Sequence, residues 1–357
     1  MRFFPLLLLA LVVRPLTADD GADSVRTANG LAGYPILYYS PETRWAAGAG
    51  ALYFFRAEEN SSRPTNITSG IIYTQNRQFL FEVTSNAFFR GGSLWHPGSF
   101  YFQKLPSRFF GIGSATPDSA EEEYTAQIVR INPSLLWKAA EGLFIGAQVH
   151  YEAWTVKETE PGRALAGGGV PGSSATTVMG VGGAVNYDTR DNIFAPLSGS
   201  FYQANAITSP EWLGSTAAFS RFRADLREYF ALGGENVLST QLMLQSTAGT
   251  VPFRFLPQLG GQNVLRGLYE GRYRDRHMAA VQAEVRTAFW RRFGLALFTG
   301  IGDVAPELSG FSWKSMKVTY GAGFRFAFIP EEHIILRIDF GFAKNSDGVY
   351  VTLNEAI

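Results

Sequence analysis

Apolar and polar residues alternate along most of this chain, in runs that end at glycine, proline, asparagine or aspartate. In residues 334–342, large apolar side chains occupy every second position, with Arg337 and Asp339 between them. Successive side chains of a β-strand point to opposite faces, so this pattern predicts an all-β protein. The predicted strands cover residues 33–39, 45–55, 69–73, 78–89, 93–103, 124–137, 143–157, 176–187, 199–207, 216–232, 236–247, 278–290, 293–302, 314–328, 334–342 and 349–353.

Strand length and composition favour a membrane barrel over a soluble sandwich. Alternation alone suits both folds, because a sandwich also has one apolar and one polar face. Many of the runs, however, approach the roughly 9–11 residues with which a tilted strand crosses a bilayer. Aromatic residues make up 14% of the chain, and it contains 38 glycines. We therefore predict a transmembrane barrel, with polar side chains in the lumen and apolar ones against lipid.

The connections between the predicted strands are alternately short and long. Short ones fall at 90–92, 139–142, 232–235, 291–292 and 329–332, and long ones at 106–123, 158–175 and 252–276. Outer-membrane barrels keep short turns on the periplasmic side and long loops outside. Five predicted strands follow the loop 252–276 and eleven precede it, counting 33–39. This predicts an antiparallel up-and-down barrel of sixteen strands, with fourteen as the alternative.

The segment 259–275 is the longest part of the second half that does not alternate. It contains four glycines and the arginines Arg266, Arg272 and Arg274. Loops this long are usually functional or disordered, and glycines allow sharp turns and close approach to another backbone. We predict an ordered extracellular loop folded back into the lumen, called the inward loop below.

The N-terminus predicts export. Residues 1–18 combine a basic start, a short apolar segment and small residues near Ala18, as in a secretory signal peptide. We predict a signal peptide at 1–18, a short periplasmic lead-in at 19–32 and the barrel at 33–357. No later stretch has the roughly 18 apolar residues of a transmembrane helix. The expected location is the outer membrane of a Gram-negative bacterium.

The titratable residues give little support to catalysis or to nucleic-acid binding. Lys+Arg and Asp+Glu are each 31, so no net field attracts nucleic acid. Cysteine is absent, which excludes thiolate metal sites and a cysteine nucleophile. The four histidines, His96, His150, His277 and His333, lack metal-ligand spacing. A serine–histidine hydrolase using His150 is a weaker interpretation than a wall histidine, so we predict no enzyme, no cofactor and no metal.

Two further groups of residues have predicted structural roles. Asp188, Arg190 and Asp191 lie in one turn segment, and we interpret them as a structural lock of that turn. Tryptophan favours the membrane–water interface, so we predict interface anchors at Trp45, Trp95, Trp137, Trp154, Trp212, Trp290 and Trp313.

The stretch 264–275 resembles the inward-folded loop of the BamA/TamA superfamily, the bacterial surface antigens. That family carries a Val-Arg-Gly-Phe/Tyr signature between the eleventh and twelfth of sixteen strands, and Arg266 and Gly267 match its core. The motif residues are Val264, Leu265, Arg266, Gly267, Leu268, Tyr269 and Gly271. Segments 187–192, 284–286, 298–303 and 337–339 also resemble the family, and the resemblance covers roughly residues 33–357.

The resemblance implies that Arg266 fixes the loop to the inner wall through an acid. A guanidinium pairs best with a carboxylate through a forked, charge-assisted contact. Glu284 is the leading partner, and Asp303 and Asp339 are the alternates. Arg286, Arg325, Arg337 and Asp339 are expected to form a general charge network in the lumen rather than a selective filter.

The resemblance also implies a function in inserting or translocating proteins, or lipids, at the outer membrane. Its physical basis would be a weak seam between a short first strand and a last strand of about five residues, whose edges could template an incoming strand. The expected partners are outer-membrane lipid, client outer-membrane proteins and a separate periplasmic protein. The last is expected because we predict a barrel-only member, without the family's polypeptide-transport-associated domains. The alternative is a passive pore or structural protein plugged by its inward loop.

Overall fold

A computed structural model describes residues 30–55, 65–329 and 333–357. The predicted signal peptide and most of the predicted lead-in lie outside these residues. The strands are β1 (Gly30–Ser40), β2 (Arg44–Phe55), β3 (Thr65–Thr74), β4 (Phe79–Phe89), β5 (Leu94–Phe109), β6 (Glu122–Ile131), β7 (Ser134–Ala140), β8 (Leu143–Thr159), β9 (Thr176–Asp188), β10 (Gly199–Ser209), β11 (Phe219–Gly233), β12 (Asn236–Gly249), β13 (Gln258–Leu259), β14 (Tyr273–Arg274), β15 (His277–Trp290), β16 (Phe293–Ala305), β17 (Lys317–Ile329), β18 (Ile334–Ala343) and β19 (Ser346–Leu353).

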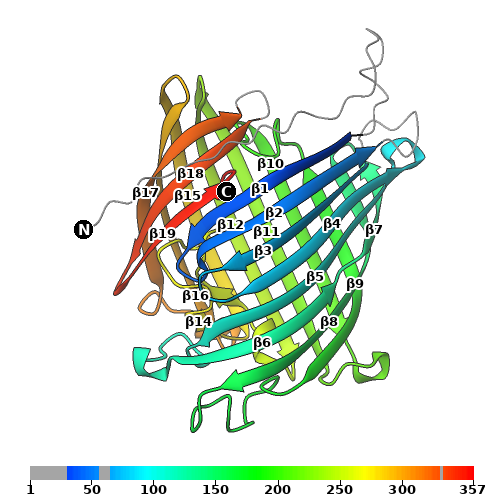
Figure 1. Cartoon of the computed structure of the whole chain (residues 1–357), viewed down its shortest axis with the longest axis vertical. Helices are drawn as coiled ribbons and strands as arrows, with labels where there is room; N and C mark the ends of the chain where they lie inside the picture. Colours follow the sequence, from blue (N-terminus) through cyan, green and yellow to red (C-terminus); the bar gives the residue numbers. More distant parts are fainter. Residues whose placement is uncertain (1–29, 56–64, 330–332) are drawn as a thin grey trace.

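In the described part of the chain these strands form a closed antiparallel barrel of sixteen (Figure 1). Neighbours in the sequence are neighbours in the sheet, and β19 returns to β1. The count is sixteen because β6 and β7 are two halves of one barrel strand, both held between β5 and β8. β12 is then the eleventh barrel strand and five follow the inward loop, so the prediction of sixteen is confirmed.

The break between β6 and β7 falls at Asn132 and Pro133, inside the single strand predicted at 124–137. Proline has no N–H to donate to a ladder, which interrupts regular pairing. Asn132 keeps a reciprocal pair of backbone bonds with Ser99, and Pro133 accepts one from the Val149 N–H at 2.9 Å. The prediction of one continuous strand was wrong here, but the barrel order is unaffected.

The two faces of the sheet differ as the alternation predicts. Leu297 is 65% exposed on the outer face, and Phe324 and Val281 lie exposed there too. Inward-facing Glu284 and Asp339 are completely buried. An apolar exposed face around the whole barrel suits contact with lipid. No helix in the described residues is long and apolar enough to cross a membrane.

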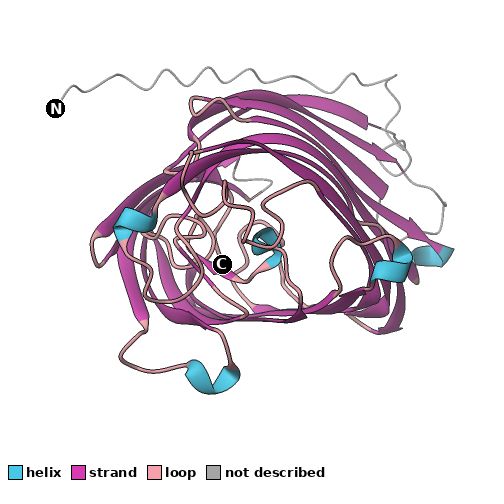
Figure 2. Cartoon of the chain, turned by 90° about the horizontal axis from the view of Figure 1, so that it is seen from below, coloured by secondary structure: helices cyan, strands magenta, loops and turns pink. Residues whose placement is uncertain are grey.

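The connection 250–276, which contains the predicted segment 259–275, enters the lumen as predicted (Figure 2). From here on, the inward loop means residues 250–276. It is organised by the short antiparallel pair β13 and β14 and by a 3-10 turn at its base. It joins the long-loop end of the barrel, which we define by the connections 110–121, 160–175 and 250–276; the opposite side is the short-turn end. The 3-10 helices are η1 (Arg90–Gly92), η2 (Asp118–Ala120), η3 (Glu211–Leu213), η4 (Phe253–Phe255) and η5 (Leu308–Gly310).

The seam between β1 and β19 is paired at one register position in the described residues, Tyr39 with Val351. The predicted cause was wrong: β1 has 11 residues and β19 has 8, so neither is as short as expected. The seam is weak because β19 ends at Leu353. The chain then turns into the lumen, where Ile357 is buried and the C-terminus lies inside the ring (Figure 2). In this register Leu353 lies opposite Leu37, so residues 30–36 of β1 extend past the end of β19.

Candidate functional site in the lumen

Arg266, at the tip of the inward loop, is buried between two carboxylates of the barrel wall. Its Nη2 lies 2.5 Å from Glu284 Oε2 on β15, and its Nη1 lies 2.5 Å from Asp339 Oδ2 on β18. Arg266 is 1% exposed and both acids are fully buried. The guanidinium also covers the Phe298 ring at 3.6 Å. Two charge-assisted bonds and a cation–π contact thus hold the loop tip.

Further arginines surround the same two acids. Asp339 Oδ1 lies 2.6 Å from Arg325 Nη1, and Asp339 Oδ2 lies 3.2 Å from Arg337 Nη1. Arg286 is 3.9 Å from Glu284. The sequence analysis missed Glu355, whose carboxylate binds Arg325 at 2.7 Å. A buried charge is tolerated only when it is paired, and these mutual contacts provide the pairing.

Asp303, the other acid considered as a partner, does not contact Arg266. Its Oδ1 accepts a hydrogen bond from Ser114 at 2.5 Å and lies 3.4 Å from Lys317 Nζ. Asp303 lies near the long-loop end of β16, where it links the 110–121 connection to the wall. Between the two alternates, the structure selects Asp339.

The loop tip approaches the wall at backbone distance because glycines face each other. Gly267 has φ +108°, and its N–H donates to Tyr350 Oη at 3.0 Å. Ser346 Oγ donates to the Gly267 carbonyl at 2.6 Å. A Cβ on Gly341 would lie 2.6 Å from the Arg266 carbonyl carbon, too close for any side chain. Leu265 is held at φ +53° with no exposed surface.

The other motif residues lie around this tip. Leu268 is buried in a cluster with Leu259, Leu265 and Met243, and Val264 packs against its edge. Tyr269 points away from this cluster, and its ring meets the Phe110 ring edge-on at 5.7 Å. A Cβ on Gly271 would lie 2.5 Å from an Arg274 nitrogen, which explains the small residue there.

The base of the inward loop has a second anchor, which the sequence analysis did not find. Phe253 and Phe255 are buried against the opposite wall, in a cluster with Phe109, Tyr124 and Trp154. Beside them, Arg254 Nε lies 3.6 Å from Glu152. The available signal was the apolar run from Val251 to Leu256, which is interrupted only by Arg254. The loop therefore spans the lumen from the β5–β11 wall to the β15–β18 wall.

Two tryptophans do not match the predicted interface role. Trp154 is 2% exposed and its indole N–H donates to the Gly172 carbonyl at 2.9 Å. Trp95 packs between Phe88 and Phe144, both of them buried. The prediction used the residue type alone, whereas the strands of Trp95 and Trp154 place both side chains on the lumen face.

The predicted turn residues are joined in the connection between β9 and β10. Arg190 makes a forked contact with Asp188, through Nε at 2.9 Å and Nη2 at 2.8 Å. Asp191 Oδ1 accepts bonds from the backbone N–H groups of Asn192, Leu197 and Ser198. These bonds close a turn and leave no group directed at a ligand, which favours the structural interpretation.

His150 is a wall residue with a polar neighbour and an aromatic one. Its Nδ1 lies 2.5 Å from Asn132 Oδ1, and its ring meets Phe255 at 5.3 Å. No serine hydroxyl is among its contacts in the described residues, so the hydrolase interpretation gains no support. Within the same residues, no group of three or more His, Cys, Asp or Glu side chains could hold a metal ion.

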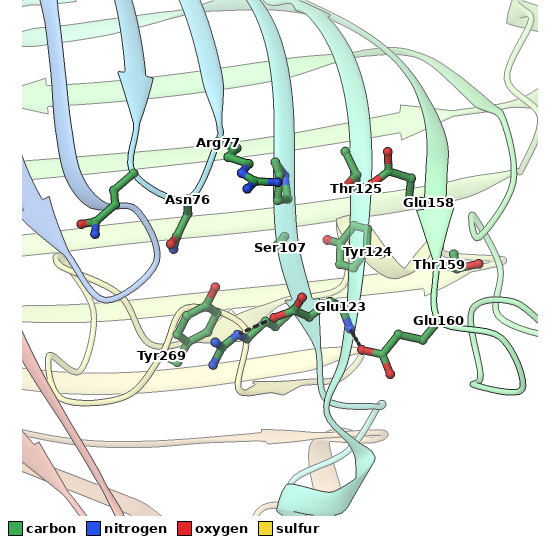
Figure 3. Close-up of a pocket in the computed structure, with 13 residues that line it drawn as sticks. Asn76, Arg77, Ser107, Glu123, Tyr124, Thr125, Glu158, Thr159, Glu160 and Tyr269 are labelled. Carbon is green, nitrogen blue, oxygen red and sulfur yellow. Dashed lines mark hydrogen bonds and ion pairs between the residues drawn. The ribbon is translucent and has the colours of Figure 1, made fainter.

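A polar hollow of about 490 Å³ opens at the long-loop end, between the wall and the inward loop (Figure 3). Tyr269 borders it on the loop side, and Glu123 and Glu160 border it on the wall side. Glu160 accepts a bond from the Glu123 N–H at 2.7 Å, and Arg108 lies 3.9 Å from Glu123. Its lining is mainly polar, and it forms a water-accessible hollow beside the loop.

The inward loop also touches the turn between β1 and β2. The Glu270 N–H donates to the Glu42 carboxylate at 2.9 Å. Loss of water around the Glu270 side chain, and then the nearby Glu42 charge, raise the pKa of Glu270 to about 7, although part of this residue still faces lumen water. The loop thus reaches both sides of the seam, through Tyr350 on β19 and Glu42 beside β1.

A sixteen-stranded barrel with an arginine-tipped loop in its lumen agrees with the family comparison. A model of the Omp85 superfamily domain matches residues 72–350. The chain belongs to the Omp85 superfamily. Among curated proteins, none matches it at the level of sequence.

Solved structures share the fold of this Omp85 barrel at low sequence identity. BamA from Haemophilus ducreyi lacking POTRA domains 1–3 is similar with a TM-score of 0.64 and 12% identity, over 92% of this chain and 70% of that chain. CdiB from Acinetobacter baumannii gives 0.55 and 10%, over 91% and 59%. CdiB from Escherichia coli gives 0.54 and 9%, over 90% and 62%. This Omp85 barrel thus spans about three fifths of either CdiB chain, and the likeness at these identities concerns the fold.

Proposed function

We propose that this Omp85 barrel assists the insertion or translocation of other proteins, or of lipids, at the outer membrane of a Gram-negative bacterium, without catalysing a reaction. The observation that carries the proposal is the seam. β1 and β19 are paired at Tyr39 and Val351 alone in the described residues, whereas β1 pairs with β2 along its whole length.

An unpaired strand edge presents a row of free N–H and C=O groups, which other chains can join. In a membrane such groups cannot be satisfied by water, so an open edge gains much from an added strand. The edge of β1 before Tyr39, from Gly30 to Tyr38, has this property, and Leu31 and Leu37 lie exposed on that strand. A strand of a client barrel could extend the sheet there by β-augmentation. Opening of the Tyr39–Val351 pair would then let the client strand enter between β1 and β19.

The proposed partners follow from this geometry. The client is a β-rich outer-membrane protein, because only an extended strand continues an antiparallel sheet. Outer-membrane lipid covers the apolar outer face. We assign delivery of the client to a separate periplasmic protein that meets the short-turn end. The long-loop end would then face the outside.

A passive pore plugged by the inward loop is the second candidate. The observation in its favour is the tightness of the plug, with Arg266 and both of its carboxylates buried. In this case the seam would stay closed, and the lumen would conduct ions at a rate set by the loop.

A cysteine placed on the seam distinguishes the two, because the natural chain contains no cysteine. Val351→Cys in proteoliposomes should crosslink to an unfolded eight-stranded outer-membrane barrel carrying one cysteine in its last strand. Val285→Cys, on β15 within the fully paired sheet, is the matched control and should not crosslink. Absence of crosslinks at Val351→Cys, together with steady ion conductance, would favour the plugged pore.

A further inference from the structure

We propose that the lumen wall between β6 and β11, beside the base of the inward loop, binds a phosphate-bearing anion. The proposal does not depend on the insertion function and concerns a different wall from the one that holds Arg266.

Positive charge exceeds negative charge on this wall. Two carboxylates, Glu152 and Asp225, face five guanidinium groups. The five arginines are Arg130, Arg221, Arg223, Arg227 and Arg254. On the opposite wall, Arg266, Arg286, Arg325 and Arg337 are nearly balanced by Glu284, Asp339 and Glu355.

The close pairs use up both carboxylates. Arg130 Nε lies 2.5 Å from Glu152 and Arg227 Nη2 lies 2.9 Å from Asp225, so each acid already has one near partner. Arg254 and Arg223 are held more loosely, at 3.6 Å and 3.8 Å from the same two acids. The carboxylate of Glu270, on the inward loop, also attracts Arg130 and Arg254, so at least two guanidinium charges remain to be balanced by another group.

Arg221 is the clearest of the unbalanced groups. Among the described residues it has no carboxylate at ion-pair distance, and its guanidinium lies 5.3 Å from the centre of the Phe255 ring. Glu152 attracts its charge from beyond ion-pair distance, while Arg130 and Arg223 repel it. An anion placed among the three guanidinium groups would replace repulsion with attraction.

The wall leaves room for such a ligand. Arg223 faces the lumen with 44% of its side chain exposed, so water-accessible space lies beside it. Between β8 and β11, β9 presents Gly180, Gly182 and Ala184 to the lumen at this level, and β10 presents Ile207 and Asn205, so no side chain longer than these stands between the two strands.

Buried polar atoms on the same wall also lack partners. His150 is 4% exposed, and its Nε2 has no hydrogen-bond partner in the described residues; neither has Arg254 Nε. Buried polar atoms without partners are uncommon, because each lost hydrogen bond destabilises the fold. Arg254 Nε is a donor in any state. Turning over the Asn132 amide gives His150 Nε2 the proton. His150 Nε2 and Arg254 Nε then lie 3.9 Å and 3.6 Å from the Glu152 carboxylate, beyond hydrogen-bond distance, and both can donate to an anion that binds beside it.

Phosphate fits this set of donors better than a monovalent ion does. Its several oxygens can accept bonds from guanidinium groups on different strands at once, and guanidinium forks match that geometry. Because Arg254 belongs to the inward loop, a bound phosphate would also connect the loop base to the wall. The same group occurs on soluble phosphates and on anionic lipid headgroups.

Titration calorimetry of the full chain in a zwitterionic detergent, with inorganic pyrophosphate at constant ionic strength, tests the site. We expect saturable binding that weakens at least tenfold in the double variant Arg221→Gln, Arg223→Gln. The double variant Arg291→Gln, Arg292→Gln, an equal loss of charge in the exposed β15–β16 turn, should bind as the natural chain does. The heat-resistant folded band on gels checks that each variant is folded. No saturable binding, or equal binding by the folded double variant, would overturn the proposal.

Short-chain lipids identify the source of the phosphate group. Competition by dihexanoylphosphatidylglycerol, but not by dihexanoylphosphatidylcholine, would identify an anionic lipid headgroup. Binding of pyrophosphate without competition by either lipid would identify a soluble anion. Equal competition by the zwitterionic lipid would contradict recognition by charge. None of these measurements uses a client protein, so their failure leaves the proposed function untouched.

Discussion

At the scale of single residues, the lumen site depends on one buried arginine and the acids around it. Arg266 loses all contact with water, which is tolerable because Glu284 and Asp339 each face one of its terminal nitrogens. Its backbone can reach them because Gly267 and Gly341 have no side chains where the two segments meet. Charge pairing and close packing are therefore two parts of one contact.

Replacing Arg266 with alanine should destabilise the barrel and free the loop. Two buried carboxylates would lose a partner, an effect of about 3–5 kcal/mol for a buried pair broken on one side. We expect a lower temperature at which the folded band disappears on gels, and faster proteolysis within residues 250–276.

The control for this change is Arg163→Ala, in the exposed connection between β8 and β9, where the arginine pairs with Glu160 at 3.4 Å. Exposed pairs contribute about 0–1 kcal/mol, so this variant should behave as the natural chain does. Equal heat resistance of the Arg266→Ala and Arg163→Ala proteins would show that the buried contact does not hold the loop.

Gly341→Ala tests the close approach without altering a charge. The new methyl group would meet the Arg266 backbone at 2.6 Å, so either the loop tip or β18 must move. Overpacking of this kind destabilises by about 1–3 kcal/mol. Gly183→Ala is the matched control, since its nearest heavy atom would be 3.7 Å away. Thermal unfolding should separate the two variants, and identical curves would contradict the packing.

Sequence reasoning reached part of this site. The motif indicated Arg266, and alternation put Glu284 and Asp339 on the polar faces of their strands. Asp303 was a candidate through the family resemblance. Alternation fixes the face of a side chain but not its height along the barrel, which depends on strand register. Glu355 was missed for a related reason: it lies after the last strand, in a segment that turns into the lumen, where periodicity carries no information.

At the scale of elements, the inward loop is a brace with two attachments. Its tip binds the β15–β18 wall, and its base packs Phe253 and Phe255 against the β5–β11 wall. The sequence predicted the tip from its glycines and arginine. It did not predict the base, because an aromatic pair in a loop does not identify the wall it packs against.

The contact of the loop with the β1–β2 turn should depend on pH. The pKa of Glu270 is raised in the folded protein to about 7 from an ordinary 4.5, so the folded state binds more protons between these values. By linkage, this contribution is greatest below about pH 4.5 and is lost as pH rises through 7. Proteolysis of the loop should accelerate between pH 5 and pH 8.

Glu270→Gln removes the titrating group while keeping its shape and its backbone bond to Glu42. Proteolysis of this variant should vary less with pH across that range. The same acceleration in both proteins would mean that another group is responsible.

At the scale of the whole molecule, the described strands close into a ring, and the β1–β19 seam is its least paired junction. Strand count and loop alternation were accessible from the sequence because each strand repeats the same pattern. The seam was predicted for the wrong reason: β1 and β19 are not short, but their offset leaves Tyr39 and Val351 as the paired residues. Offset is a property of ring closure, which no local pattern records.

The most direct test of the account is to lock this seam. Because the natural chain contains no cysteine, Tyr39→Cys with Val351→Cys allows one disulfide to form between the paired strands. In proteoliposomes, the oxidised double variant should lose the ability to accelerate insertion of an eight-stranded outer-membrane barrel, and a reductant should restore it. Full acceleration by a completely crosslinked sample would contradict the claim that β1 and β19 open to receive a strand.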